Sequence, residues 1–282
     1  MKISLEYQSD LFEMDAVAPV RPASLSGRSG AFVDNMVLPV HRWFRYSAGF
    51  SADWVRCLVR ERCGDSSSFV VLDPFCGVGT TLLACDAENL QSLGFETHPF
   101  IYRIANAKLR GIHVDLSTLR SVFRRYADSI PCTSPVDLGE TPPLLTKCYT
   151  SEVLSLLFTM RDLFLAEFDS KTPESELLWL ALTAILRSCS GVGTAQWQYV
   201  LPNKSKSDVR TPLLAFQSKA SEMLQDVEYA QRNSWCSGSH TLMTDARAPV
   251  DCPQAQVDAV VTSPPYPNNY DYADATRLEM TF

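Results

Sequence analysis

The sequence of 282 residues lacks the features that would mark a membrane or secreted protein. No apolar run approaches the roughly 18 to 20 residues that a membrane-spanning helix needs. The N-terminal stretch carries several acidic side chains and no basic start followed by an apolar segment, so it does not resemble a secretory signal. No repeat of solenoid period occurs. We therefore expect a cytoplasmic protein without a membrane partner.

Metal-binding and disulfide patterns are also missing. The nine cysteines are odd in number and irregularly spaced, and no Cys-x-x-Cys pair occurs. The four histidines are scattered along the chain. These spacings argue against a zinc site and a disulfide framework, and they favour a reducing compartment. No metal is predicted.

The composition is that of an ordinary globular protein. Hydrophobic residues make up 46% and charged residues 20%, which excludes a disordered chain, a collagen-like chain and a coiled coil. The 25 Lys and Arg against 32 Asp and Glu give a net charge of −7. This balance argues against a protein that coats nucleic acid along its whole surface, but it leaves a local basic groove open.

The order of patterns near residue 70 predicts a parallel α/β sheet. Residues 69–72 form a short apolar run, typical of a strand that is buried on both faces. A Gly-containing turn follows, and then a helix over 80–89. A second strand over 92–96 and a second helix over 99–109 complete a strand–turn–helix–strand–helix order. A helix over 51–62, with Ser51 as its cap, precedes the first strand.

The sequence pattern changes near residue 114, and helical periodicity dominates from there to about residue 235. The α/β pattern resumes with expected strands over 241–243 and 257–261. We therefore predict an N-terminal arm, an α/β domain in two pieces and a helical insertion between them. Their bounds are 1–40 for the arm, 41–113 and 236–282 for the domain, and 114–235 for the insertion. Helices are expected in the insertion over 116–126, 151–168, 174–190 and 213–231.

The first chemical motif is the turn over 73–81, with the sequence DPFCGVGTT. Two glycines two residues apart, between a buried strand and a helix, let backbone N–H groups approach a ligand closely. Glu96 follows Asp73 by 23 residues, at the end of the next strand, where a carboxylate can accept both hydroxyls of a ribose. The alternative is a tight turn that binds nothing.

The second motif is TSPPY over 262–266, at the end of the expected strand over 257–261. Proline fixes φ and removes N–H donors, so the carbonyls of Ser263 and Pro264 would be rigidly held acceptors. Such a cluster suits an amino group that must become nucleophilic, and Tyr266 offers a stacking face for an extruded base. The alternative is a Pro-Pro loop with a packed tyrosine.

Together, the two motifs resemble those of the S-adenosylmethionine-dependent amino-methyltransferases of DNA, which modify N4 of cytosine or N6 of adenine. The stretch His41 to Ser51 resembles the segment that lines the methionine pocket in that family. The stretch 244–247 (TDAR) resembles the turn that meets the cofactor's adenine. The resemblance covers about residues 41–110 and 239–282. It implies a Rossmann-like methyltransferase sheet with a large helical insertion.

The resemblance also implies a role for individual residues. In this reading, Glu96 holds the cofactor's ribose and Asp245 its adenine amino group, while the Gly-rich loop frames its methionine end. The expected cofactor-binding residues are His41, Asp73, Phe75, Gly77, Gly79, Thr80, Glu96 and Asp245. The expected catalytic residues are Ser263, Pro264, Pro265 and Tyr266.

The implied chemistry is direct transfer, in which the amino lone pair attacks the sulfonium methyl group in line. No covalent enzyme intermediate is needed. Cys76 lies in the cofactor loop, and Tyr266 rather than a cysteine follows the Pro-Pro pair. We therefore interpret Cys76 as a packing residue. Ser263 at the head of the loop favours cytosine N4 over adenine N6.

The resemblance leaves partners and completeness open. Sheets of this family have seven strands, and the sequence predicts about four. We therefore expect a truncated or split enzyme, with double-stranded DNA as substrate and a second chain that supplies the other strands. A restriction–modification system is the implied setting. The alternatives are a non-catalytic cofactor-binding or interaction subunit and an RNA amino-methyltransferase. Candidate DNA contacts are the basic side chains between Arg103 and Arg125 and between Lys204 and Arg210, the latter preceded by an aromatic and polar stretch over 196–199.

Overall fold

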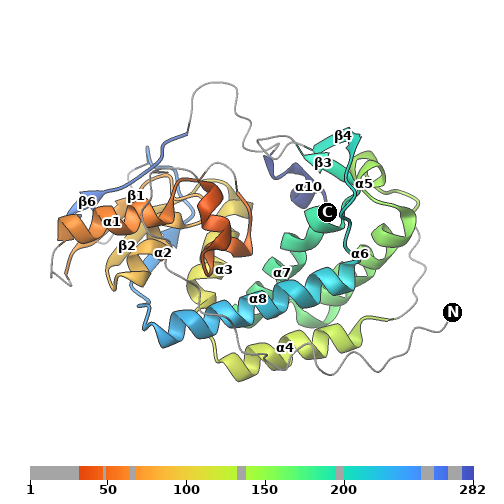
Figure 1. Cartoon of the computed structure of the whole chain (residues 1–282), viewed down its shortest axis with the longest axis horizontal. Helices are drawn as coiled ribbons and strands as arrows, with labels where there is room; N and C mark the ends of the chain where they lie inside the picture. The colour runs from red at the N-terminus through yellow and green to blue at the C-terminus, as the bar shows by residue number, and fades with distance from the viewer. Residues whose placement is uncertain are drawn as a thin grey trace.

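The computed structural model describes residues 32–46, 49–63, 68–131, 138–194, 200–248, 257–265 and 275–282. In these ranges, a parallel sheet with its covering helices lies on one side of the molecule (Figure 1). A group of longer helices lies on the other side, and helix α3 (Pro99–Gly111) stands between the two. The molecule is therefore of mixed α/β class, as the sequence predicts.

The sheet has four described strands in the order β5-β2-β1-β6, and every neighbouring pair is parallel. Leu72 of the central strand β1 is in register with Leu93 of β2 and with Val260 of β6. Because parallel strands end on the same side, the loops that follow them gather at one edge. The bounds are Val70–Asp73 for β1, Gln91–Phe95 for β2, Ser239–Leu242 for β5 and Ala259–Val260 for β6.

Helix α1 packs on one face of this sheet, together with α2 and α3. Helix α1 (Ala52–Cys63) begins after Ser51, whose Oγ accepts a hydrogen bond from the Trp54 backbone N–H at 3.3 Å. This confirms the predicted cap. Helix α2 (Thr80–Ala87) follows the Gly-rich turn, and its buried side chains form a small core with α1 and β1. Each of these elements lies within two residues of its predicted position.

The opposite face of the sheet is less buried, which corrects one expectation. The sequence predicts that residues 69–72 are buried on both faces, but only Val71 and Asp73 of β1 are fully buried. Val70 and Leu72 are half-buried, and Val260 on the neighbouring strand is 59% exposed. The reason is the alternation of side chains along a strand, since the described helices α1, α2 and α3 cover one face.

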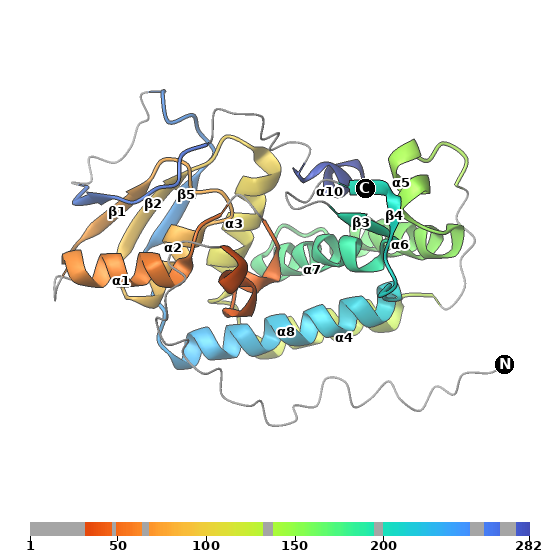
Figure 2. The ribbon, with the colours of Figure 1, turned by 45° about the horizontal axis from the view of Figure 1, so that its top comes forward.

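The helical segment over 116–232 is built from long helices with ordinary caps. Asp115 and Thr150 each accept a hydrogen bond from the backbone N–H three residues further on. Helices α4 and α8 lie side by side along one edge of the molecule (Figure 2). The bounds are Leu116–Ser129 for α4, Pro143–Cys148 for α5, Ser151–Leu163 for α6, Pro173–Cys189 for α7 and Pro212–Arg232 for α8.

Some elements of this segment differ from the expected helices. A single π-turn, η5 (Phe164–Phe168), ends the helix predicted over 151–168. A short hairpin of β3 (Val192–Thr194) and β4 (Val200–Ser205) joins α7 to α8, where the sequence suggests only a loop. Residues 196–199, named above as a candidate DNA-reading stretch, lie outside the described residues.

One hydrophobic core connects the sheet side with the helical side. It contains buried residues of α2 and α3 as well as residues of α4, α6, α7 and α8. Where α3 meets α7, a Cβ on Gly111 would lie 2.5 Å from a side-chain carbon of Leu177. A larger residue at this position would therefore require the Leu177 side chain to shift. The predicted domain boundaries at 113/114 and 235/236 therefore cut across a shared core, and they stay a prediction.

A buried carboxyl in α2 leads to a prediction about stability and pH. Asp86 is 1% exposed, and burial raises its pKa from 3.8 to about 7. The folded protein therefore keeps a proton on Asp86 that the unfolded chain releases, so stability should fall as the pH rises through this window. We expect Asp86→Asn to gain free energy of unfolding over the wild type between about pH 4 and pH 7, by up to about 4 kcal/mol.

Urea unfolding at several pH values, with wild type and variant side by side, measures this gain. Because the prediction concerns the difference in free energy of unfolding between the two proteins, the contributions of other titrating groups cancel. Asp128→Asn, an exposed change in α4, is the control and should give parallel curves. A constant gap between wild type and Asp86→Asn from pH 4 to pH 8 would contradict the prediction.

Candidate cofactor site and catalytic loop

The turn between β1 and α2 has the backbone shape that the glycines predict. Gly77 has φ 53° and Gly79 has φ 86°, both in the left-handed region that favours glycine. Gly79 caps the N-terminus of α2, and Thr80 is the first residue of that helix and is buried. Several backbone N–H groups at this helix start therefore have no partner within the helix.

Asp73 joins this turn to the second motif. Its carboxylate is 1% exposed and accepts three hydrogen bonds. The Phe75 backbone N–H donates at 3.1 Å, the Thr81 hydroxyl at 2.6 Å and the Thr262 hydroxyl at 2.7 Å. Burial raises the pKa of Asp73, and these three donors oppose that rise. Asp73 thus fixes the start of the Gly-rich turn, the first turn of α2 and the residue directly before Ser263.

Glu96 lies just beyond the carboxyl end of β2, as predicted. Its Oε1 accepts a hydrogen bond from the His98 backbone N–H at 2.8 Å. Burial raises its pKa, while the backbone of His98 and Gly77 favours the ionised form. The contact with Gly77 brings the carboxylate to the Gly-rich turn. The Oε1 atom of Glu96 is therefore oriented by the His98 backbone N–H.

Asp245 lies on the turn after β5, and in this structure Arg247 occupies its carboxylate. The Arg247 backbone N–H donates to Oδ1 at 2.9 Å, and the guanidinium Nη2 lies 2.5 Å from Oδ2. These contacts hold the pKa of Asp245 down at about 2. The carboxylate is therefore charged at neutral pH, and a ligand amino group would have to share it with Arg247.

One cavity of about 250 Å³ collects residues from four separate segments of the chain. Four of the predicted site residues line it, one from each segment: Phe75, Glu96, Asp245 and Pro265. The segments follow β1, β2, β5 and β6, so the cavity lies at the carboxyl ends of the strands. The remaining lining residues are Pro74, Phe95, Thr97, Ala246 and Arg247.

Other predicted site residues do not line this cavity. His41 is buried beside Lys108, and burial lowers its pKa to about 3, which leaves the ring neutral. Asp73, Gly77, Gly79 and Thr80 form the turn behind the cavity wall rather than the wall itself. Ser263 is half-buried and Pro264 is exposed, next to Pro265 in the wall. Tyr266 lies outside the described residues.

The structure assigns some cavity residues that the sequence reasoning missed. Phe95 and Thr97 lie on either side of Glu96, and their position beside that residue was the available signal. Cys76 was interpreted as a packing residue, and its environment agrees. Burial raises the pKa of its thiol well above the ordinary value, and its side chain packs where Gly94 leaves space.

A larger, mainly apolar cavity shares no lining residue with the first. It has a volume of about 510 Å³ and lies between α3, α6, α7 and the helix α10 (Arg277–Thr281) that follows the second motif. Thr97 lines the small cavity and Pro99 the larger one, and residues two positions apart have Cα atoms within about 7 Å. Aromatic side chains in its wall include Phe100, Trp179 and Phe282.

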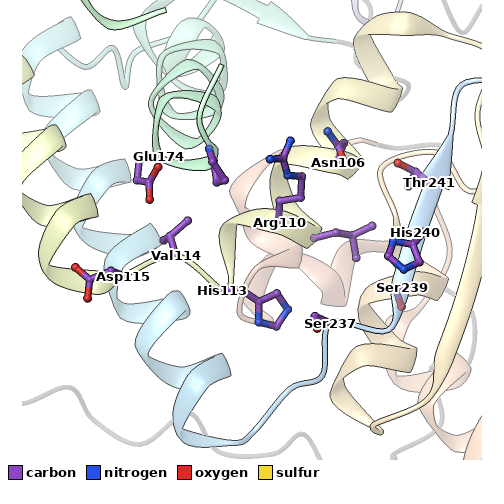
Figure 3. A pocket seen from close by; sticks show the side chains of 12 residues that line it. Asn106, Arg110, His113, Val114, Asp115, Glu174, Ser237, Ser239, His240 and Thr241 are labelled. Carbon is purple, nitrogen blue, oxygen red and sulfur yellow. The ribbon is translucent and has the colours of Figure 1, made fainter. Parts of the chain in front are cut away.

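A third cavity, of about 540 Å³, lies at the other end of β5 (Figure 3). Arg110, His113 and His240 contribute basic groups to its wall, whereas Glu174 and Asp115 contribute acidic ones. None of the predicted site residues lines it.

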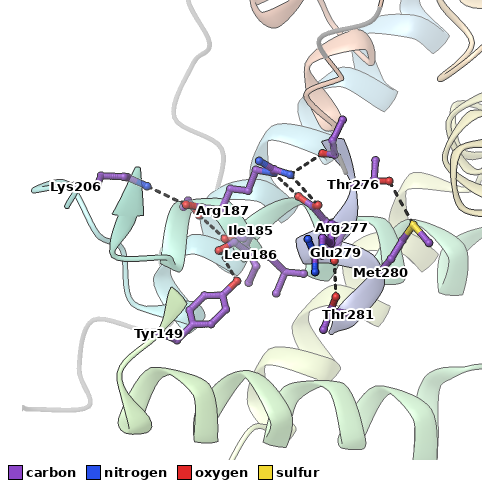
Figure 4. A network of polar contacts seen from close by, with 12 residues as sticks. Tyr149, Ile185, Leu186, Arg187, Lys206, Thr276, Arg277, Glu279, Met280 and Thr281 are labelled. Atoms are coloured by element: carbon purple, nitrogen blue, oxygen red, sulfur yellow. Dashed lines mark hydrogen bonds and ion pairs between the residues drawn. The ribbon is translucent and has the colours of Figure 1, made fainter. Parts of the chain in front are cut away.

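The helix after the second motif is anchored to the helical segment (Figure 4). The Arg187 guanidinium of α7 forms an ion pair with Glu279 of α10, with Nε 2.5 Å from Oε1, and it donates to the Ala275 carbonyl at 2.7 Å. Lys206 donates in turn to the Arg187 carbonyl at 2.9 Å. The chain around the second motif is therefore fixed at both ends, by Asp73 before it and by Arg187 after it.

The predicted basic DNA contacts are partly used inside the protein. Arg103 forms an ion pair with Glu176 and stacks on the Trp179 ring at 3.9 Å. Lys108 is 1% exposed, so it cannot reach a phosphate on the surface. Arg110, Arg124 and Arg125 are exposed. The first candidate cluster is therefore smaller than expected.

Comparison with known proteins supports the family suggested by the two motifs. Residues 39–107, which contain the Gly-rich turn and Glu96, match the family model described as "DNA methylase" (N6_N4_Mtase). The resemblance to the N6/N4 DNA methylases is confirmed. Methylases of this type use S-adenosylmethionine as the methyl donor.

Two curated relatives extend the similarity beyond that segment. The type II methyltransferase M.BsoBI of Geobacillus stearothermophilus is 26% identical over 273 residues, which is 86% of this chain and 52% of the relative. The type II methyltransferase M.AvaI of Nostoc sp. (strain PCC 7120) is 27% identical over 291 residues, which is 91% of this chain and 56% of the relative. The chain thus spans about half the length of these methyltransferases. No solved structure matches it.

Two further findings concern the described residues. None of their helices is long and apolar enough to cross a membrane. No cluster of three or more His, Cys, Asp or Glu side chains in these ranges is arranged to hold a metal ion.

The bond between Asp73 and Thr262 gives a testable prediction. Thr262→Val keeps the size of the side chain but removes one donor from a buried carboxylate. We expect the free energy of unfolding to fall by about 1.5 to 3 kcal/mol, the range for hydrogen bonds to charged groups. Urea unfolding measures this change. Thr146→Val, which removes an exposed hydroxyl bonded to the Pro143 carbonyl, is the control and should cost under about 0.5 kcal/mol. Equal losses in the two variants would refute the role given to Asp73.

Proposed function

We propose that the chain is the S-adenosylmethionine-binding and catalytic part of a DNA amino-methyltransferase, which methylates cytosine N4 in preference to adenine N6. The observation that carries this proposal is the cavity at the strand ends. Four segments that the sequence analysis named meet there, and Asp73 bonds the Gly-rich turn to Thr262, the residue before Ser263. The type II methyltransferase relatives support a role in a restriction–modification system.

The residues of the cavity fit the proposed cofactor. Glu96 would accept hydrogen bonds from its ribose hydroxyls, because one carboxylate oxygen is already oriented by the His98 backbone. Asp245 would accept from an adenine amino group, in competition with Arg247. Gly77 and Gly79 supply the left-handed backbone of the turn, so that N–H groups at the start of α2 would face the methionine end. When bound, S-adenosylmethionine supplies an electrophilic methyl group on a sulfonium.

The catalytic loop would prepare the target nitrogen. The Ser263 hydroxyl and the Pro264 carbonyl would accept hydrogen bonds from the two N–H groups of the exocyclic amine. That geometry draws the nitrogen toward a tetrahedral shape and directs its lone pair at the methyl group. As the nitrogen–carbon bond would form, the carbon–sulfur bond of the donor would break and leave a neutral thioether, and one N–H proton of the amine would pass to solvent by way of these acceptors. Positioning of this kind supplies much of the acceleration in a direct transfer.

The position of the base is proposed from the second cavity. An extruded base needs an apolar space near the cofactor, and the wall of the 510 Å³ cavity begins at Pro99, two residues after Thr97 of the smaller cavity. Tyr266, which follows Pro265, would stack on that base. The basic side chains Arg110, Arg124 and Arg125 remain candidates for contacts with DNA phosphates.

The decisive experiment uses the purified chain with methyl-labelled S-adenosylmethionine. Duplex DNA and RNA of mixed sequence are offered separately and then digested to nucleosides. Label on cytosine N4 is the expected result. Label on adenine N6 would correct the base, and label on RNA alone would favour the RNA methyltransferase alternative. Cofactor binding without transfer would favour a non-catalytic subunit, or one that needs a second chain.

Two variants separate cofactor binding from transfer. Glu96→Gln should weaken binding of S-adenosylmethionine about tenfold in calorimetry, since it weakens charge-assisted hydrogen bonds. Ser263→Ala should leave that affinity unchanged but lower the transfer rate on the order of a hundredfold. The exposed changes Glu140→Gln and Ser121→Ala are the controls. Wild-type transfer by Ser263→Ala would contradict the role of the loop.

A further inference from the structure

A buried carboxylate in the helical segment holds the chain that precedes the cofactor turn. Asp226 lies on α8 and is 1% exposed. Its carboxylate accepts a hydrogen bond from the Val40 backbone N–H at 2.9 Å and one from Trp43 Nε1 at 2.8 Å. Arg42 adds two more, from Nε at 3.1 Å and from Nη2 at 2.6 Å. A single side chain of α8 thus contacts three residues that lie more than 180 positions earlier in the sequence.

The turn that Asp226 holds is not one that its sequence prefers. Val40 has φ 66° and ψ −44°, although it is β-branched and disfavours positive φ. Such a conformation is unfavourable for a β-branched residue and persists only where the surroundings enforce it. The turn continues as the short helix η4 (His41–Trp43), which lies between α8 and the sheet side in Figure 2.

Two lysines add to this restraint from neighbouring helices. Lys108 of α3 donates to the His41 carbonyl at 3.2 Å, and Lys219 of α8 donates to the Arg42 carbonyl at 3.3 Å. The backbone of the turn is therefore fixed from both the sheet side and the helical side. Burial lowers the pKa of Lys108 to about 7.

The restrained turn leads directly to the cofactor loop. Three residues after Trp43, the ring of buried Tyr46 packs over Gly77, where an added Cβ would lie 3.6 Å from the ring. Phe44 makes an edge-to-face contact with Phe100 at the start of α3, at 5.9 Å between ring centroids. A shift of the turn would therefore move the ring that covers Gly77.

The energetics favour a positioning role over a purely stabilising one. Burial raises the pKa of Asp226 even though Arg42 lies beside it, so the charge is costly to keep in the interior. Buried ion pairs contribute little net stability compared with apolar residues of the same volume. What the network provides is a fixed geometry, because several donors converge on one carboxylate.

We propose that Asp226 is a positioning residue for the cofactor site. It holds the turn at Val40 to Trp43, and through Tyr46 it sets the shape of the loop around Gly77. The helical segment is then part of the cofactor-binding module rather than a separate recognition domain. The inference rests on the proposed function for the identity of the cofactor, but not for the mechanical coupling.

The test compares Asp226→Asn with Glu228→Gln, a change of the same kind on the same helix. Glu228 forms an ion pair with exposed Arg232 and serves as the control. Calorimetry with S-adenosylmethionine, at a temperature where both variants are folded, should show affinity weakened about tenfold for Asp226→Asn and unchanged for Glu228→Gln. In transfer assays, the KM for S-adenosylmethionine should rise while the KM for DNA stays constant. A folded Asp226→Asn protein with wild-type cofactor affinity would overturn the proposal.

Hydrogen exchange separates this proposal from the proposed function. In Asp226→Asn, backbone amides over 40–46 and 76–79 should exchange faster than in the wild type, with or without cofactor. If the wild type does not bind S-adenosylmethionine, the proposed function fails, whereas faster exchange at 76–79 still supports the coupling. Unchanged exchange at 76–79 overturns it. If Asp226→Asn does not fold, Arg42→Gln, whose side chain is partly exposed, replaces it in the same comparison with the same expected direction.

Discussion

The arrangement of the site depends on the hydrogen bonds that the Asp73 carboxylate accepts. A charge that is buried to this degree must be satisfied by donors, and here they come from three different parts of the chain. The Asp73 carboxylate therefore holds the Gly-rich turn close to Thr262, the residue before Ser263, because it accepts hydrogen bonds from both. The Asp73 carboxylate therefore binds groups of the protein itself, whereas Phe75 and Glu96 line the cavity.

A second constraint is the shared core between sheet and helices. Gly111 lets α3 and α7 approach so closely that the two parts behave as one packing unit. Asp226 bonds to the chain before the Gly-rich turn, and Arg187 bonds to the helix after the TSPPY motif. A separate domain would have its own hydrophobic core and be joined to the rest by linkers, whereas here the sheet side and the helical side share one core.

Much of this arrangement could be predicted from local pattern. The apolar run at Val71, the glycines of the turn and the cap at Ser51 depend on near neighbours, so a linear reading finds them. The parallel direction of the strands follows from the alternation of strands and helices, and parallel strands place their loops at one edge. The convergence of Glu96 and the turn after β5 on one cavity was predictable for that reason.

Other features had no local signal. Asp226 is an ordinary acidic residue in an amphipathic helix, and only the folded chain brings Val40 and Trp43 to it. The sequence reasoning counted Arg103 and Lys108 as surface charges, because burial of a long cation cannot be inferred from spacing. The β3–β4 hairpin was missed because its strands are short and lie between strong helical patterns.

The anchoring of the chain on both sides of the catalytic loop has a thermodynamic consequence. A segment held at one end must lose most of its conformational entropy when a substrate orders it, whereas a segment held at both ends has already lost part of it on folding. Thr262 at one end and Ala275 at the other are each fixed by hydrogen bonds to a charged side chain. Under the proposed function, part of the entropic cost of placing Ser263 and Pro264 against a base would therefore be met when the protein folds, and less of the binding free energy would be consumed.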